Sequence, residues 1–281
     1  MNEIIVYDSG IGGIPILCKL QKAFPGETFL YFSDPLRMPY GAKTEKELIA
    51  IVQENFAYFS TYRPKAVIVA CNTVSEVALP HLKGLRYPVL GVEQQVERTI
   101  AKTGCLRPCV LCTERTAEKI ASHLTDEIRK KVRIVAAKKL ASEIENRGGN
   151  LSVEEVQVQT SSLGLEGHDL LFLGCTHYIW IAQQLKLLYP HLLLSDGTDF
   201  LLDRATRMLF LKETDTVKKE SEATKEHDFF QNAARGSLPL STETPKEIQT
   251  GTVHFMGDGS LKNQNTYLFF YKHLFKNQKN K

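Results

Sequence analysis

The sequence lacks the features that would place the protein in a membrane or on nucleic acid. No apolar stretch reaches the roughly 18 residues that a membrane-spanning helix needs. The first residues lack the basic start and apolar core of a secretory signal, so we expect a cytoplasmic protein. The 35 basic and 32 acidic residues nearly balance, which argues against a surface built to bind nucleic acid.

Cysteine is scarce, and its spacing does not indicate a disulfide framework. The 281 residues include six cysteines, which we expect to be free thiols in the reducing cytoplasm. Cys105, Cys109 and Cys112 have the spacing of the iron–sulfur triplet in radical enzymes that use S-adenosylmethionine. The sequence from Cys109 to Cys112 is typical of a strand, however, which would turn these two side chains to opposite faces, whereas a cluster needs convergent thiolates. We therefore predict buried strand cysteines here and no metal site.

The sequence does contain a regular alternation of short apolar runs and longer amphipathic stretches. Expected strands lie at residues 4–7, 28–32, 66–70, 89–92, 109–112, 132–136, 170–173 and 192–194. Expected helices include residues 44–62, 115–130 and 178–188. Short, almost wholly apolar strands separated by helices are typical of parallel sheets that are buried on both faces. We predict two similar α/β domains with mainly parallel sheets, the first formed by residues 1–92 and 206–281 and the second by residues 93–205.

Residues 212–250 differ from the rest of the chain. They are polar and charged and contain few apolar anchors, a composition that does not support a packed core. We predict a polar insertion here, with ordered structure returning in a strand at residues 253–255 and an aromatic helix at residues 267–275.

One internal similarity points to chemistry. Residues 67–73 and 171–177 each consist of an apolar strand, a small residue, a cysteine and two polar residues, so that Cys71 and Cys175 each lie between a strand and a helix. Ligands bind at the carboxyl ends of strands in open α/β sheets, and the N-terminus of a helix favours a thiolate. A single buried cysteine is more often a plain core residue, but the matched pair favours function. We predict that the two thiols flank one substrate at the domain interface and move a proton across its two faces.

Two loops and one histidine add candidate binding groups. Asp8-Ser9-Gly10-Ile11-Gly12-Gly13 follows the first strand but lacks the dinucleotide fingerprint, so we expect its amides to bind a carboxylate or to form a plain turn. Asp8 is a candidate to tune a thiol or to cap the helix. In Pro39-Tyr40-Gly41, the Tyr40 hydroxyl and the adjacent N–H groups suit a carboxylate. His177 follows Cys175 closely enough to assist it or to bind the substrate.

Five motifs, in this order, resemble those of the glutamate racemase family within the aspartate/glutamate racemase superfamily. They are Asp8-Ser9-Gly10-Ile11-Gly12-Gly13, Arg37-Met38-Pro39-Tyr40-Gly41, Ala70-Cys71-Asn72-Thr73, Pro88-Val89-Leu90-Gly91-Val92 and Gly174-Cys175-Thr176-His177-Tyr178. Thr113 and Thr116 are similar to the paired threonines of that family. The resemblance covers most of residues 1–205.

The resemblance implies conversion of L-glutamate to D-glutamate without pyridoxal phosphate or a metal, supplying peptidoglycan synthesis. It implies that Cys71 and Cys175 are the acid/base residues and that Asp8 and His177 tune them. For substrate binding it implies Asp8, Ser9, Pro39, Tyr40, Gly41, Asn72, Thr73, Thr113, Thr116, Thr176 and His177. The resemblance leaves open whether the protein forms a homodimer.

The sequence departs from the family pattern in places. Where the family has a Pro-Leu-Val-Glu-like stretch with an acidic residue near one cysteine, this chain has residues 139–145, and Glu143 is the expected counterpart. Residues 93–96 and Cys112 also differ from the pattern. Two other functions stay open: a racemase of aspartate or another acidic amino acid, and a catalytically weak relative that binds a ligand or a protein.

Overall fold

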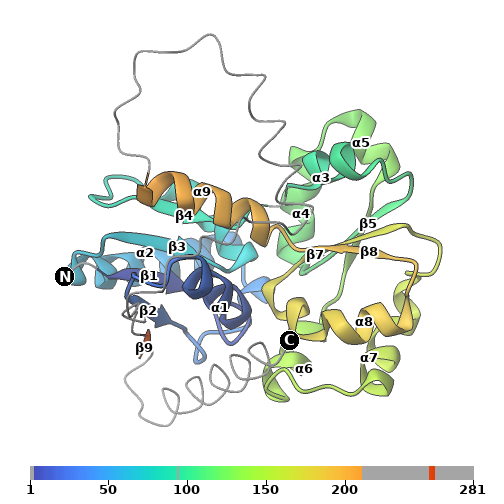
Figure 1. Ribbon diagram of the computed structural model, residues 1–281, viewed down its shortest axis with the longest axis horizontal. Coiled ribbons are helices and arrows are strands. Elements are labelled where there is room, and N and C mark those ends of the chain that lie inside the picture. Colours follow the sequence, from blue (N-terminus) through green and yellow to red (C-terminus); the bar gives the residue numbers. More distant parts are fainter. Residues whose placement is uncertain (1–2, 94, 211–252, 257–281) are drawn as a thin grey trace, which may run out of the picture.

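The structure is a computed structural model that describes residues 3–93, 95–210 and 253–256, and in these residues it contains two parallel sheets (Figure 1). The first sheet has the order β4-β3-β1-β2-β9 and the second the order β6-β5-β7-β8. The strands are β1 Ile4–Tyr7, β2 Phe29–Phe32, β3 Ala66–Val69, β4 Val89–Gly91, β5 Pro108–Cys112, β6 Arg133–Ala136, β7 Leu170–Gly174, β8 Leu193–Ser195 and β9 Val253–Met256. Every strand pair is parallel, so the predicted fold class is confirmed.

The strands form where the apolar runs predict them. All eight predicted strands up to residue 195 are present, with bounds that differ by at most one residue, and β9 matches the strand expected at residues 253–255. Strands β1, β3, β5 and β7, which have neighbours on both sides, are wholly buried, whereas the edge strands β6 and β8 are partly exposed. This gradient follows because helices cover both faces of a parallel sheet while solvent reaches its edges.

The bounds of the helices differ from those predicted from the amphipathic stretches more than the bounds of the strands differ from those predicted from the apolar runs. They are α1 Ile14–Ala23, α2 Glu45–Tyr62, α3 Val96–Thr103, α4 Glu114–His123, α5 Asp126–Lys131, α6 Leu140–Asn146, α7 Val153–Thr160, α8 Ala182–Leu188 and α9 Thr198–Phe210. The short 3-10 helices are η1 Tyr40–Ala42, η3 Leu79–His81, η4 Ser161–Leu163 and η5 Thr176–Ile181, and η2 Val74–Ala78 is a short π-helix. The single helix predicted at residues 115–130 is divided, because Leu124 and Thr125 adopt extended backbone between α4 and α5. The helix predicted at residues 178–188 begins as η5 and becomes α-helical only at Ala182.

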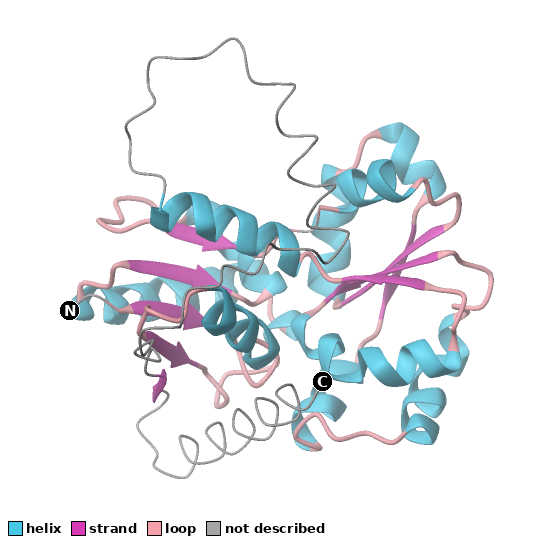
Figure 2. Cartoon of the chain, in the orientation of Figure 1, coloured by secondary structure: helices cyan, strands magenta, loops and turns pink. Residues whose placement is uncertain are grey.

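Helices cover both faces of each sheet (Figure 2). On the first sheet, α1 and α9 pack on one face and α2 on the other. On the second sheet, α6, α7 and α8 pack on one face and α3 and α4 on the other. One hydrophobic core therefore forms on each face of each sheet. The carboxyl ends of the strands of both sheets lie where the two units meet.

The chain passes from the first sheet to the second after β4 and returns after β8. The returning segment leads into α9, which packs on the first sheet through Leu201 and Ala205, and β9 pairs with β2. Leu201 and Ala205 fall within residues 93–205 of the predicted division, so these contacts place all of α9 with the first sheet and do not support a boundary between residues 205 and 206. The division into residues 1–92 with 206–281 and residues 93–205 remains a proposal. The polar segment at 212–250 and the helix expected at 267–275 lie outside the described residues.

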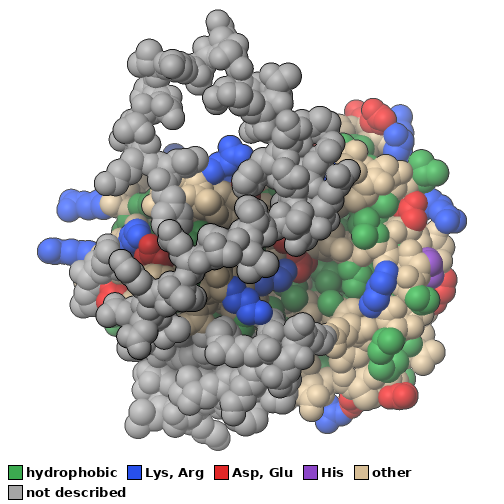
Figure 3. Space-filling view, viewed as in Figure 1, with side chains coloured by type: hydrophobic (Ala, Val, Ile, Leu, Met, Phe, Trp, Pro, Cys, Tyr) green, Lys and Arg blue, Asp and Glu red, His purple; other side chains and the backbone are tan. Residues whose placement is uncertain are grey.

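On the face shown in Figure 3, charged side chains of both signs are scattered among the coloured residues. No helix within the described ranges is long and apolar enough to cross a membrane. Cys109 and Cys112 both lie in β5 and enter cores on opposite faces of the sheet, as predicted.

Candidate active site

Cys71 and Cys175 line one small cavity between the two sheets. Cys71 follows β3 and Cys175 follows β7, and their exposed fractions are only 5% and 6%. The other residues around the cavity are Ser9, Met38, Pro39, Tyr40, Gly41, Asn72, Thr73, Thr113, Ala141, Thr176 and His177. The cavity volume is about 20 Å³, which is roughly the space of one water molecule. The structure thus brings together most of the predicted site residues, from both halves of the chain.

Cys71 is a buried thiol rather than a thiolate. Its Sγ lies 4.0 Å from the Ser9 Oγ. Burial raises the pKa of Cys71 and the nearby Asp8 raises it further, while the Val74 N–H lowers it. The sequence-based expectation that the following helix favours a thiolate is therefore wrong for Cys71, because the effect of burial exceeds that of the single backbone donor in the short turn η2. At neutral pH this cysteine holds its proton.

His177 stands between Cys175 and a carboxylate. Its Nδ1 lies 3.8 Å from the Cys175 Sγ, and its Nε2 lies 2.8 Å from the Glu145 Oε2. Burial by itself lowers the pKa of His177, but the hydrogen bonds with Cys175 and Glu145 outweigh it and raise that pKa well above the ordinary value. The imidazole is therefore protonated at neutral pH and faces the Cys175 sulfur with a positive charge.

Glu145 is a site residue that the sequence pattern did not reveal. The expected acidic counterpart was Glu143, but the structure places the carboxylate of Glu145 against His177. The same Oε2 also accepts the Ile11 N–H, 2.8 Å away on the other domain. The helical spacing indicates this residue, because position 145 lies four residues after the cavity-lining Ala141 and therefore on the same face of α6.

Asp8 joins the two domains inside the site. It is fully buried, and its carboxylate accepts the Gly10 N–H at 2.9 Å and the Thr176 hydroxyl at 3.0 Å. Burial raises the pKa of Asp8, and the positive charge of His177 opposes that rise. Because α1 has no side-chain cap, these contacts rule out the alternative that Asp8 caps the helix and favour a role in the site.

The Tyr40 hydroxyl is directed to a buried polar cluster. It donates to the Asp34 Oδ2 at 2.5 Å and accepts the Tyr7 hydroxyl at 3.0 Å and the Asn55 amide at 3.2 Å. Arg37 also binds Asp34, at 2.7 Å. With its hydroxyl engaged in this way, Tyr40 offers a ligand its backbone, in the segment Pro39-Tyr40-Gly41, more readily than its phenol.

Three threonine hydroxyls meet where the domains touch. Thr73 lies 3.2 Å from Thr113 and 3.1 Å from Thr116, and the last two are 2.9 Å apart. The predicted pair Thr113 and Thr116 is therefore at the site edge, with Thr73 as the partner from the first domain. Asn72 has a buried side-chain N–H₂ with no hydrogen-bond partner among the described residues. A buried donor of this kind costs free energy until an acceptor binds it.

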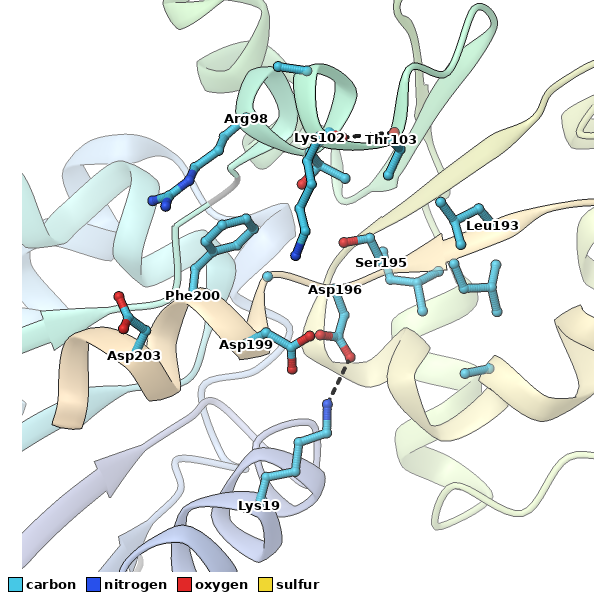
Figure 4. A pocket seen from close by; sticks show the side chains of 16 residues that line it. Lys19, Arg98, Lys102, Thr103, Leu193, Ser195, Asp196, Asp199, Phe200 and Asp203 are labelled. Atoms are coloured by element: carbon cyan, nitrogen blue, oxygen red, sulfur yellow. Dashed lines mark hydrogen bonds and ion pairs between the residues drawn. The ribbon is translucent and has the colours of Figure 1, made fainter. Parts of the chain in front are cut away.

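A much larger cavity, of about 700 Å³, lies elsewhere between the sheets and shares no residue with the first. Figure 4 shows the ion pair of Lys19 with Asp196, at 3.5 Å, and Arg98 beside the ring of Phe200. The described lining residues of this cavity include no cysteine, and its charged side chains are those of Lys19, Arg98, Lys102, Asp196, Asp199 and Asp203. The predicted site residues line the small cavity and not this larger one.

Comparisons with known proteins point to one family. No protein-family model matches the chain. Glutamate racemase of Carboxydothermus hydrogenoformans is 33% identical over 217 residues, covering 73% of this chain and 78% of that protein. Glutamate racemase of Persephonella marina is 33% identical over 207 residues, covering 70% and 78%.

Solved structures share the fold. Glutamate racemase of Campylobacter jejuni matches with a TM-score of 0.71 and 21% identity, covering 97% of this chain and 99% of that one. The racemase isoform RacE1 of Bacillus anthracis matches with a TM-score of 0.70 and 22% identity, covering 100% and 94%. From the sequence identity over most of both chains, the protein belongs to the glutamate racemase family.

Proposed function

We propose that the protein interconverts L- and D-glutamate, with Cys71 and Cys175 exchanging the α-proton on opposite faces of the substrate and with no cofactor. The observation that carries this proposal is that two buried thiols, one from each sheet, line a single cavity. The curated relatives are named for the same reaction. Its product would supply peptidoglycan synthesis, as the family resemblance implies.

The position of the proton on each cysteine determines which thiol gives a proton to the substrate and which sulfur takes one. Cys71 begins as a thiol, because burial raises its pKa, and Cys175 begins beside the protonated His177. In one direction the Cys175 sulfur takes the α-proton while Cys71 gives its proton to the other face of the same carbon. The C–H bond that breaks and the C–H bond that forms balance, and the two cysteines end with exchanged protonation states. The opposite enantiomer uses the same path in reverse.

Polar groups around the thiols suit an amino-acid substrate. The unpartnered Asn72 amide is placed to bind a carboxylate, with hydroxyls of Thr73 and Thr176 nearby. The α-proton of an amino acid is a very weak acid, so the site must stabilise the charge that develops on the substrate. Fixed donors act most strongly where water is excluded, and this cavity has room for about one water molecule.

Two other functions have weaker support. Aspartate racemase of Picrophilus torridus shares the fold, with a TM-score of 0.52 and 14% identity, but this likeness concerns the fold alone. A relative that only binds its ligand would not need two thiols in one cavity. Glutamate racemisation therefore remains the proposal that the residues support best.

The experiment follows exchange of the α-proton with deuterium oxide. The purified protein is given L-glutamate, D-glutamate or L-aspartate in separate reactions with no cofactor added. We expect the optical rotation of either glutamate enantiomer to decay to zero while deuterium enters at Cα, with much slower change of aspartate. Absence of both exchange and racemisation for glutamate would contradict the proposal, and faster turnover of aspartate would assign the substrate differently.

A further inference from the structure

None of the described residues that line the cavity between the cysteines is a lysine or an arginine. Among these described lining residues only His177 is cationic, and that charge already faces Cys175 and Glu145. Glutamate carries a second carboxylate on its side chain. A site that selects this substrate needs a group to receive that charge, and the polar residues named so far supply only neutral donors.

A second small cavity adjoins the first and supplies a cation. The two cavities share Pro39, Gly41, Thr113 and Ala141 as lining residues. The second cavity is also lined by Glu114 and Lys138. Among the described residues that line either cavity, Lys138 is the one lysine or arginine.

Lys138 is held by an interaction that is easily exchanged. It lies between β6 and α6, and its Nζ is 2.8 Å from the Oε1 of Glu114, the first residue of α4. The Lys138 side chain is 73% exposed and that of Glu114 is 44% exposed. Water screens an ion pair at this exposure, so that breaking it costs little free energy. The long, flexible stem of lysine lets the ammonium group move to a new partner.

The position of the thiols fixes where the α-carbon of a bound glutamate lies. Its α-carbon must lie between Cys71 and Cys175, and the free amide of Asn72 suits the α-carboxylate. Gly41 and Thr113 border both cavities. A glutamate whose side chain extends toward them brings its far carboxylate to the border where the second cavity begins.

We propose that Lys138 binds the side-chain carboxylate of the substrate, taking it in place of Glu114, and thereby selects a dicarboxylic amino acid. This inference rests on the proposed function. Glu114 occupies the ammonium group of Lys138 in the empty site and competes with the substrate for it. Removing the charge of Glu114 therefore strengthens glutamate binding, and removing that of Lys138 weakens it.

The test compares Lys138→Met with Lys139→Met. Lys139 is also exposed but lines neither cavity, so it controls for loss of one surface charge. We expect Lys138→Met to raise KM for both glutamate enantiomers by about three- to fivefold, the effect of a partly exposed charged contact, with a smaller change in kcat. Lys139→Met should change KM less than twofold, and Glu114→Gln should lower it. An unchanged KM in Lys138→Met, or an equal rise in both lysine variants, would overturn the inference.

A binding measurement separates this inference from the proposed function. Calorimetric titration with D-glutamate and with D-glutamine, which lacks the side-chain charge, needs no turnover. The unsubstituted protein should prefer D-glutamate, and Lys138→Met should lose most of that preference while D-glutamine binding stays the same. Equal preference in both proteins contradicts the role of Lys138 even if racemisation is observed. Loss of preference supports it even if racemisation is not.

Discussion

Glu145 and His177 form an ion pair in which Oε2 and Nε2 lie 2.8 Å apart, and this pair is the means by which helix α6 acts on Cys175. The carboxylate itself does not contact the thiol. It holds the proton on the imidazole, and the other imidazole nitrogen faces the sulfur. Because the same carboxylate accepts the Ile11 N–H from the other domain, the charge state of His177 depends on how the two domains meet.

Glu145→Gln is expected to lower the pKa of His177 and to slow racemisation by about tenfold, the effect of weakening one charged hydrogen bond. The loss of kcat/KM at alkaline pH should begin at lower pH than in the unsubstituted protein, because the imidazole gives up its proton more easily. Imidazole proton shifts measured by NMR and the pH–rate profile check both effects. Glu143→Gln is the matched control, and an equal change in that variant would contradict the assignment of Glu145.

The same pair makes stability depend on pH. The folded-state pKa of His177 is raised above its unfolded value. Its contribution is therefore fully present below about pH 6.5, the unfolded value, and is lost as the pH rises through the folded-state pKa. Unfolding by denaturant at a series of pH values should show the unsubstituted protein more stable than Glu145→Gln by about 1–3 kcal/mol at the acidic end. The difference should disappear at the alkaline end, so a constant difference would argue against the ion pair.

Cys71→Ala and Cys175→Ala are each expected to lower kcat about 10²–10⁴-fold or more, because each removes a proton-transfer group. Each variant should still exchange the α-proton of one enantiomer with solvent deuterium, and the two variants should favour opposite enantiomers. Cys18→Ala is the control, since Cys18 is fully buried in a core outside the site. It should lose about 1 kcal/mol of stability and keep its rate. Normal racemisation in either site variant would contradict the two-thiol mechanism.

Tyr40→Phe is expected to destabilise the fold by about 1–3 kcal/mol, because Asp34 loses a buried donor. KM for glutamate should change less than about twofold, since the hydroxyl is engaged by Asp34, Tyr7 and Asn55 in the polar cluster. Thermal unfolding and initial rates measure the two effects. Tyr58→Phe, at an exposed hydroxyl, is the control, and a large rise in KM for Tyr40→Phe would assign the phenol to the substrate.

Gly12→Ala tests how tightly the first loop packs on His177. A Cβ at this position would lie 2.6 Å from the His177 Nδ1, the atom that faces Cys175. We expect kcat to fall by about 10²-fold, as small displacements of a catalytic group produce. Gly26→Ala, where a Cβ would meet nothing within 4 Å, should leave kcat unchanged. Similar rates for the two variants would show that the loop accommodates the added methyl group without displacing His177.

The sequence predicts strands and the cysteine pair well for a physical reason. Central strands such as β3 and β7 are buried on both faces, so each appears as a continuous apolar run that ends sharply at Cys71 or Cys175. The helices are harder to delimit, because extended backbone at Leu124 and Thr125 has no strong sequence signal.

Other parts of the site depend on tertiary packing. Whether residue 143 or 145 faces the site depends on the rotation of the short helix α6 about its axis. The direction of the Tyr40 hydroxyl depends on Asp34 and Asn55, which come from a loop and from α2. The raised pKa of Cys71 depends on burial by surrounding elements, which outweighs the local preference of the strand end.

The small volume between the cysteines also bears on the kinetics. A space of about 20 Å³ is far smaller than a glutamate molecule, and contacts such as that of Arg115 with the Lys43 carbonyl, at 3.1 Å, join the domains beside it. Entry of substrate therefore requires a gating motion that separates the domains, and such motions often limit turnover. The apparent affinity equals the intrinsic affinity reduced by the fraction of molecules that are open. Turnover limited by this motion would fall as solvent viscosity rises, even though the proton transfers themselves take place between two buried thiols.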